Sequence, residues 1–77
     1  MQLQDMKCGD KGKIVAIRGA SPLYKQRLIA MGLLPGTEFS VVRIAPLGDP
    51  VQIAVRGVAL SLRKLEANVL VIDEVKV

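Results

Sequence analysis

One stretch of the chain, residues 21–36, has the start, the spacing and the end of an α-helix. The Ser21 hydroxyl can cap the first turn, and Pro22 suits the first helical position, where its missing N–H is not needed. Apolar side chains then recur at i, i+4 and i+7 and form one stripe of Tyr24, Leu28 and Met31. Gly32 stands where helices often end in a left-handed residue, and a Pro-Gly turn follows. We expect one helix of about three turns, so the rest of the chain must fold differently.

The remaining apolar residues fall into short segments bounded by Gly, Pro or polar residues, which is typical of β-strands. These segments are residues 13–18, 37–45, 51–56, 59–63 and 69–72. Apolar residues alternate with more polar ones from 51 to 55, which predicts that one face of this strand points into the core. The apolar face switches between Val41 and Val42, which predicts a bulge. Residues 63–68 are polar and lack alternation, so we expect a single 3₁₀ or α-helical turn there.

These elements fit one small domain that spans residues 1–77. Short strands leave sheet edges that proteins commonly protect by curling the sheet on itself. We therefore predict a mostly β fold, a small and partly open antiparallel barrel of about five strands with one short α-helix inserted between the first and second. No run approaches the roughly 18–20 apolar residues that a membrane span needs, so we expect no direct membrane insertion.

The sequence lacks the side chains on which most enzymes and metal sites depend. There is no His, Cys8 is the single Cys, and the seven carboxylates are spread along the chain. Without imidazole there is no ordinary general base, and Fe²⁺ loses its preferred nitrogen ligand. No glycine-rich phosphate-binding pattern is present. We predict no catalytic residue, no metal site and no cofactor, and thus a binding or regulatory module rather than an enzyme.

The charge and the aromatic content indicate what kind of partner to expect. The formal net charge is +4, but the basic residues are scattered and form no run of the kind seen in interaction tails. The two aromatic residues, Tyr24 and Phe39, both suit the core. The exposed rings on which single-stranded nucleic acids stack, or which grip proline-rich peptides, are therefore missing. We expect no nucleic-acid partner, and the lone Cys8 fits a reducing cytoplasm.

Several apolar residues are expected in turns rather than in strands. Leu33 and Leu34 precede Pro35, and Leu47 lies inside a turn with two prolines. Together with Met31 at the helix end, they form a candidate partner-binding surface, because stiff turns that present apolar side chains are typical of contact sites. The same side chains can instead fold back over the mouth of the barrel. The residues alone leave both possibilities open.

Three segments of the chain resemble, in order and in spacing, the motifs of the ferrous iron transport protein A (FeoA) family. They are residues 27–37 (RLIAMGLLPGT) followed by Val41, residues 45–50 (APLGDP), and residues 60–67 (LSLRKLEA). The resemblance covers nearly the whole chain, from about Leu3 to Val71. One departure is Cys8, because the family often has Pro before the glycine that follows. The departure affects only the opening turn.

The resemblance implies an SH3-like barrel with an inserted helix, which agrees with the fold predicted from the residues. It also implies a cytoplasmic accessory protein of bacterial ferrous iron uptake, held at the inner membrane by its partner. That partner is FeoB, a membrane permease with a cytoplasmic GTP-binding domain. We expect Met31, Leu33, Leu34, Pro35 and Leu47 to contribute contacts. Whether such a protein supports assembly of the transporter or modulates its nucleotide cycle is open.

Two other hypotheses remain at this point. A stand-alone regulatory domain, related to the C-terminal domain of iron-dependent repressors of the diphtheria toxin repressor type, is favoured by the positive charge but disfavoured by the lack of a recognition helix. A GTPase-activating role would need an arginine that reaches the permease's nucleotide site. The candidates for that arginine are Arg27, Arg43, Arg56 and Arg63.

Overall fold

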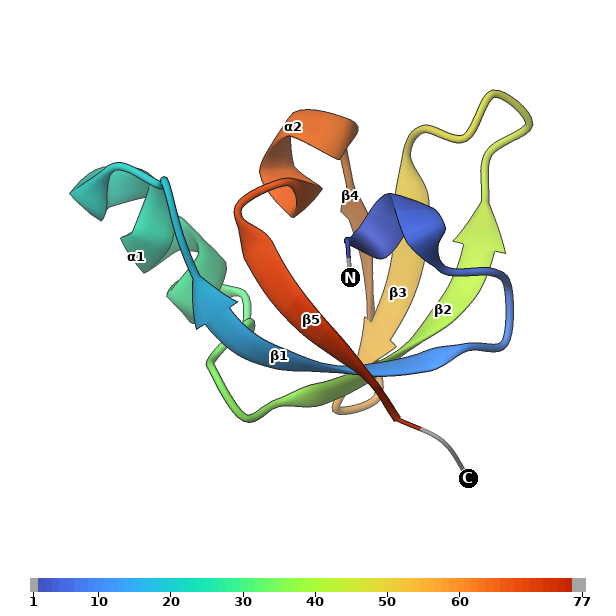
Figure 1. Cartoon of the computed structure of the whole chain (residues 1–77), viewed down its shortest axis with the longest axis horizontal. Coiled ribbons are helices and arrows are strands. Elements are labelled where there is room, and N and C mark those ends of the chain that lie inside the picture. The colour runs from blue at the N-terminus through green and yellow to red at the C-terminus, as the bar shows by residue number, and fades with distance from the viewer. Residues whose placement is uncertain (1, 76–77) are drawn as a thin grey trace.

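A computed structural model describes residues 2–75 and contains one five-stranded antiparallel sheet (Figure 1). In chain order the elements are the 3₁₀ helix η1 (Leu3–Asp5), β1 (Lys11–Ile17), α1 (Pro22–Ala30), β2 (Glu38–Ile44), β3 (Val51–Val55), β4 (Val58–Leu62), α2 (Lys64–Ala67) and β5 (Leu70–Val75). The strand order across the sheet is β4-β3-β2-β1-β5. The predicted mostly β class, with a helix inserted between the first two strands, is confirmed. The single turn expected within residues 63–68 forms as α2.

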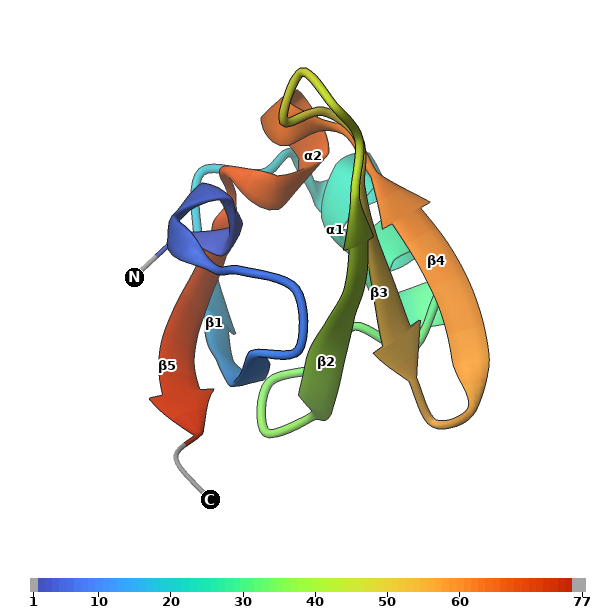
Figure 2. The ribbon, with the colours of Figure 1, turned by 90° about the vertical axis from the view of Figure 1, so that its right-hand side faces the viewer.

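The sheet is strongly curved but does not close into a barrel. β4 and β5 form its two edges, and no strand pairing joins them. Figure 2 shows β1 and β5 on one side and β2, β3 and β4 on the other, with α2 above the space between the two halves. The core is thus enclosed by a bent sheet together with short helical pieces, which is the open form of the predicted barrel.

The core is almost entirely aliphatic, and it draws on every strand and on all three helical pieces. Alternation along β3 buries each second side chain, as the sequence predicted. The buried hydrophobic residues are Leu3, Met6, Ile14, Leu28, Leu33, Phe39, Val41, Val51, Ile53, Val55, Leu62, Ala67, Leu70 and Ile72. Because η1 and α2 supply Leu3 and Ala67, these two short elements close one end of the core.

A bulge in β2 redirects its apolar residues, at the position that the sequence predicted. The pairing of β2 with β3 shifts between Val41 and Arg43. Val41 is buried, Val42 is about half exposed, and Ile44 again packs against the core. The extra residue in the bulge therefore lets both Val41 and Ile44 contribute to the interior, although they are an odd number of positions apart.

The start and the apolar stripe of α1 follow the predicted pattern. The Ser21 Oγ accepts a hydrogen bond from the Tyr24 backbone N–H at 3.3 Å, and Pro22 occupies the first helical position. Leu28 is fully buried, while Tyr24 and Met31 are half-buried and pack against the core. The helix is therefore attached to the sheet along this one stripe.

The end of α1 is a Schellman motif, which explains the burial of the residue that follows it. The Gly32 N–H donates to the Ile29 carbonyl at 2.9 Å, and the Leu33 N–H donates to the Leu28 carbonyl at 3.0 Å. Gly32 has φ +91°, the left-handed conformation that this motif requires. The motif commonly brings the two residues of the longer hydrogen bond into apolar contact. Leu28 and Leu33 are both fully buried in the core.

A glycine in β1 allows the closest packing in the core. Gly12 pairs with Phe39 in β2 and with Glu74 in β5, so it lies where β1 joins the two halves of the sheet. A Cβ atom at Gly12 would lie 2.8 Å from Phe39 Cζ, 3.0 Å from Ile72 Cγ2 and 3.1 Å from Met6 Cε. These separations are shorter than van der Waals contact, so any larger residue would force the core apart.

We predict that Gly12→Ala lowers the free energy of unfolding by about 1–3 kcal/mol, the usual cost of overpacking a tight core. Chemical denaturation followed by circular dichroism measures it. Phe39→Leu removes the ring atom nearest to the new methyl group, so the same Gly12→Ala change should cost less in that background. An equal cost in both backgrounds would show that contact with Phe39 is not the cause.

Candidate protein-docking surface

The turn between β2 and β3 holds Leu47 away from the rest of the protein. The Gly48 N–H donates to the Ala45 carbonyl at 2.7 Å, and the Ala45 N–H donates to the Pro50 carbonyl at 3.1 Å. The Leu47 side chain at the tip of this turn is 96% exposed. Because backbone hydrogen bonds fix the turn, the exposure of Leu47 is a property of the fold.

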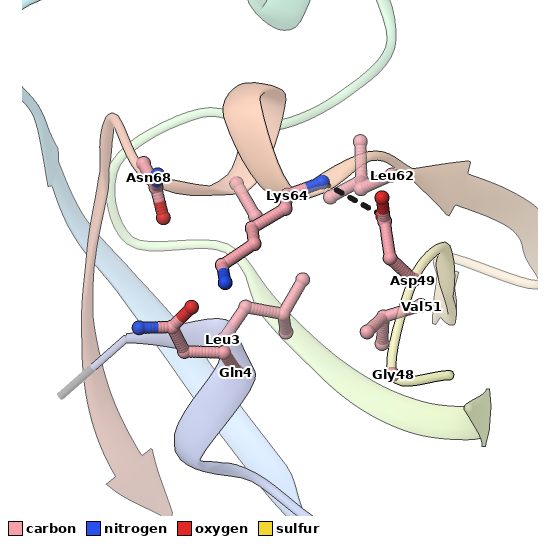
Figure 3. A pocket seen from close by; sticks show the side chains of 9 residues that line it. Leu3, Gln4, Gly48, Asp49, Val51, Leu62, Lys64 and Asn68 are labelled. Carbon is pink, nitrogen blue, oxygen red and sulfur yellow. Dashed lines mark hydrogen bonds between the residues drawn. The ribbon is translucent and has the colours of Figure 1, made fainter. Parts of the chain in front are cut away.

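The same turn is joined to α2 by a side-chain hydrogen bond. Asp49 Oδ1 accepts from the Lys64 backbone N–H at 2.9 Å (Figure 3). The first N–H groups of a helix have no partner within the helix, so this carboxylate satisfies one of them. Glu66 Oε1 accepts from the Arg63 N–H at 3.0 Å and completes the first turn of α2. Leu65, between these anchored residues, is 82% exposed.

A third exposed leucine lies on the first turn of α1. Leu23 is 77% exposed, on the side of the helix away from its buried stripe. The start of α1, α2 and the β2–β3 turn all lie on the upper side of the molecule in Figures 1 and 2, and α2 lies between the other two along the long axis in Figure 1. We call Leu23, Leu47 and Leu65 the leucine end. Burial of each of these side chains against a partner would contribute a free energy of about 1.5–3 kcal/mol. The leucine end is therefore our candidate docking surface.

The structure corrects the expectation that Leu33 contributes to a partner-binding surface. Leu33 is fully buried, because the Schellman motif at the end of α1 turns it back toward Leu28. Met31 and Leu34 are half-buried, and only Pro35 of this group is exposed. The turn after α1 is further tied to β1, where the Ile14 N–H donates to the Thr37 carbonyl at 2.9 Å.

The structure also does not bring the predicted contact residues together. Leu34 and Pro35 precede β2 and Leu47 follows it, so the seven residues of this strand separate them. Seven residues of strand span roughly 23 Å, and Figure 1 shows the two turns at opposite ends of β2. Of the predicted set, only Leu47 belongs to the leucine end.

Sequence reasoning missed the other two members of the leucine end. Leu23 precedes Tyr24 and is therefore rotated by about 100° from the buried stripe, which is a signal that a helical wheel contains. Leu65 is the one leucine within the polar residues 63–68. In a single helical turn that buries Ala67, this leucine is left on the outer side.

A small cavity lies beneath the Asp49 anchor, between η1, the β2–β3 turn and α2 (Figure 3). Leu3 lies at its apolar side, and Lys64 and Asn68 lie at its polar side. Its volume is about 10 Å³, which leaves room for about one water molecule. This cavity is therefore too small to enclose a small-molecule ligand.

The hydroxyl of Tyr24, on α1, is buried. It has no hydrogen-bond partner within the part of the chain that the structure describes. Burial raises the pKa of Tyr24 above its usual value, the nearby Glu66 carboxylate raises it further, and Arg27 partly opposes them. The tyrosine therefore stays neutral at physiological pH and contributes its ring to the core.

Residues 2–75 contain neither a metal-binding cluster nor a membrane-spanning helix. No three His, Cys, Asp or Glu side chains gather there closely enough to hold a metal ion. None of the helices in that range is both long enough and apolar enough to cross a membrane. Cys8 is exposed, with its Sγ 3.7 Å from the Val42 carbonyl oxygen.

The curved, open five-stranded sheet with one inserted helix places the protein among small SH3-like β folds. The sequence model of the FeoA domain matches residues 1–74. The chain therefore belongs to the FeoA-domain family.

Individual relatives agree with this assignment. The chain is 34% identical over 67 residues to the Fe(2+) transport protein A/Fe(2+) transporter FeoB fusion protein of Porphyromonas gingivalis. The match covers 87% of this chain but only 8% of that much longer protein. The solution structure of the FeoA protein from Chlorobium tepidum superposes with a TM-score of 0.87 at 33% identity, covering 99% of this chain and 71% of that one.

A manganese-dependent transcriptional repressor also shares the fold. Its TM-score is 0.86 at 18% identity, and the match covers 97% of this chain and 36% of the repressor. At this identity the likeness concerns the fold alone.

We predict that Asp49→Ala lowers the free energy of unfolding by about 1 kcal/mol, because it leaves an N–H of the first turn of α2 without its acceptor. Asp49→Asn keeps an oxygen at the same place and serves as the matched control, with a smaller loss. Denaturant titration measures both. If the two variants lose the same stability, the hydrogen bond to Lys64 is not what the carboxylate contributes.

We predict that Tyr24→Phe raises the free energy of unfolding by about 1 kcal/mol, because it removes a buried hydroxyl that lacks a partner and keeps the ring. Leu28→Ala, on the same stripe, should instead cost about 2–5 kcal/mol and checks that the assay detects loss of packing. Thermal and denaturant unfolding measure both. A Tyr24→Phe variant less stable than the parent contradicts the assignment of an unpaired hydroxyl.

Proposed function

We propose that this chain is a non-catalytic accessory protein of ferrous iron uptake that binds the FeoB permease. The observation that carries the proposal is the Porphyromonas gingivalis relative, in which an iron(II) transport protein A and a FeoB transporter are parts of one fusion protein. Covalent linkage holds two domains at a high effective concentration, which benefits domains that associate. We infer that this chain makes the same association through its own surface.

The leucine end is the surface that we assign to this association. It presents three leucines, each more than three quarters exposed, on three different elements. The turn that carries Leu47 is hydrogen-bonded to α2, which carries Leu65. Surfaces held rigid before binding lose less conformational entropy when the complex forms. Large apolar side chains that become buried at the centre of an interface commonly supply most of its affinity.

We place the partner contact on the cytoplasmic GTP-binding domain of FeoB, and the chain therefore in the cytoplasm at the inner membrane. Two effects of binding remain to be distinguished, support of transporter assembly and a change in the nucleotide cycle. A single-turnover GTP hydrolysis assay with and without the chain separates them. An arginine that acted in the nucleotide site would raise hydrolysis by about 10³–10⁵, whereas assembly alone leaves the rate unchanged.

We predict that Leu47→Asp weakens binding to FeoB by at least about tenfold, because a charge replaces an apolar side chain at the proposed centre of contact. The measurement is the dissociation constant for the detergent-solubilised permease, and separately for its GTP-binding domain. Because Leu47 is 96% exposed, the variant should unfold at the same denaturant concentration as the parent.

Val15→Asp is the matched control, since Val15 is about half exposed and lies on β1, away from the leucine end. It should bind FeoB as tightly as the parent. If a folded Leu47→Asp variant also binds normally, the leucine end is not the docking surface. If neither the parent nor any variant binds FeoB, the proposed function itself is wrong.

A further inference from the structure

The edge strand β4 has a free side. β4 is the last strand of the sheet and pairs only with β3. Within residues 2–75, no backbone hydrogen bond joins β4 to any other segment. Figure 2 shows β4 at the border of the sheet, with no strand beyond it. One row of its backbone donors and acceptors is therefore available to another chain.

The register shows which groups this row contains. Residues 56 and 57 form a two-residue turn, and Val55 pairs with Val58 across it. In an antiparallel hairpin of this kind the pair next to the turn exchanges both of its hydrogen bonds, and the next pair exchanges none. Ala59 and Ser61 thus direct their N–H and C=O groups away from β3.

The β4 strand itself carries no charge and no proline that would block pairing. The sequence of β4 is VALSL, with no charged residue and no proline. The opposite edge strand, β5, carries Asp73 and Glu74, both exposed. Charges on an edge strand commonly prevent it from pairing with other chains. The difference between the edges indicates that β4 is kept available for pairing.

Positive charges stand at both ends of this unprotected strand. Arg56 and Arg63 flank β4 and are both exposed. Arg56 has φ +51°, at a turn position where asparagine or glycine is favoured. Position 56 is thus occupied by a cation even though the backbone conformation there favours a smaller residue.

We propose that β4 binds an extended segment of a partner protein as a sixth strand. The paired part of the segment is about five uncharged residues long, to match the length of β4, and a carboxylate flanks it on each side to meet Arg56 and Arg63. Its apolar side chains alternate, because those on the core side cover Val58 and Leu60. Pairing with a second copy of this chain fits less well, since antiparallel β4–β4 pairing would place Arg56 of one copy beside Arg63 of the other. This inference does not rest on the identity of the partner proposed above.

The test uses a synthetic seven-residue peptide with glutamate at both ends and alternating valine and threonine between them, blocked at both termini. A second peptide carries lysine at both ends. We expect the acidic peptide, followed by ¹⁵N NMR, to shift the amide signals of Ala59 and Ser61 and to slow their hydrogen exchange. The lysine peptide should bind roughly tenfold more weakly, from the loss of two ion pairs and the gain of repulsion.

Two variants make the test specific to the backbone and to the charges. Ser61→Pro removes an outward N–H without removing a hydrogen bond to β3 and should abolish binding, whereas Ser61→Ala should not. The double variant Arg56→Glu with Arg63→Glu should reverse the preference and bind the lysine peptide more tightly. Amide spectra of the free variants check that the fold is retained.

Three results would overturn the proposal. One is the absence of any shift in β4 at millimolar acidic peptide, and another is equal binding of the two peptides by the parent chain. The third is a dimer in sedimentation experiments that Ser61→Pro dissociates, because the occupant of the edge would then be a second copy. Leu47→Asp should leave peptide binding unchanged, so this outcome is independent of the test on FeoB.

Discussion

The fold depends on the close approach that Gly12 permits between the two halves of the sheet. β1 pairs with β2 on one side and with β5 on the other, and at Gly12 the side chains of Phe39, Ile72 and Met6 converge where a Cβ would stand. A sheet that does not close by hydrogen bonding must hold its halves together by packing. The missing side chain makes that packing tight enough for a core of small aliphatic residues. The helical pieces then need to cover only the remaining open end.

Covering that end also produces the surface to which we assign function. α2 buries Ala67 in the core and donates its Lys64 N–H to the Asp49 carboxylate, so the β2–β3 turn and the helical turn are joined to each other. Elements held so tightly cannot move to cover Leu47 and Leu65. The leucines remain exposed as a consequence of how the core is closed, so the surface that we propose for the partner is already in place before binding. The edge of β4 is a second candidate surface, on which a partner would form hydrogen bonds with the backbone rather than pack against side chains.

Much of this fold could be predicted from the sequence because its determinants are local. The cap at Ser21, the left-handed Gly32 and the alternation in β3 each depend on neighbours in the chain, and each was found where expected. Which apolar turn residues are exposed depends on distant contacts and was predicted less well. Leu33 was expected in an exposed turn, but its N–H completes the hydrogen bonding at the end of α1. Leu34 and Leu47 were expected on one surface, but the whole of β2 separates them.

Local patterns also gave no sign that the start of α1, α2 and the β2–β3 turn lie on the same side of the molecule. That arrangement depends on how the curved sheet positions the two helices. The free edge of β4 required knowledge of the strand order, because a strand's sequence does not say whether it lies at the border of a sheet. The resemblance to the FeoA family implied the fold and a FeoB partner, but it did not indicate which surface would contact that partner.

The anchor between the β2–β3 turn and α2 has one more consequence, for the freedom of the sequence to change. Asp49 binds the main-chain N–H of residue 64 and not the ammonium group of its lysine. Every amino acid except proline supplies such an N–H, so the shape of this end is insensitive to what stands at position 64. Over evolutionary time that side chain can change to suit a different partner, while the turn and the leucine it carries keep their geometry.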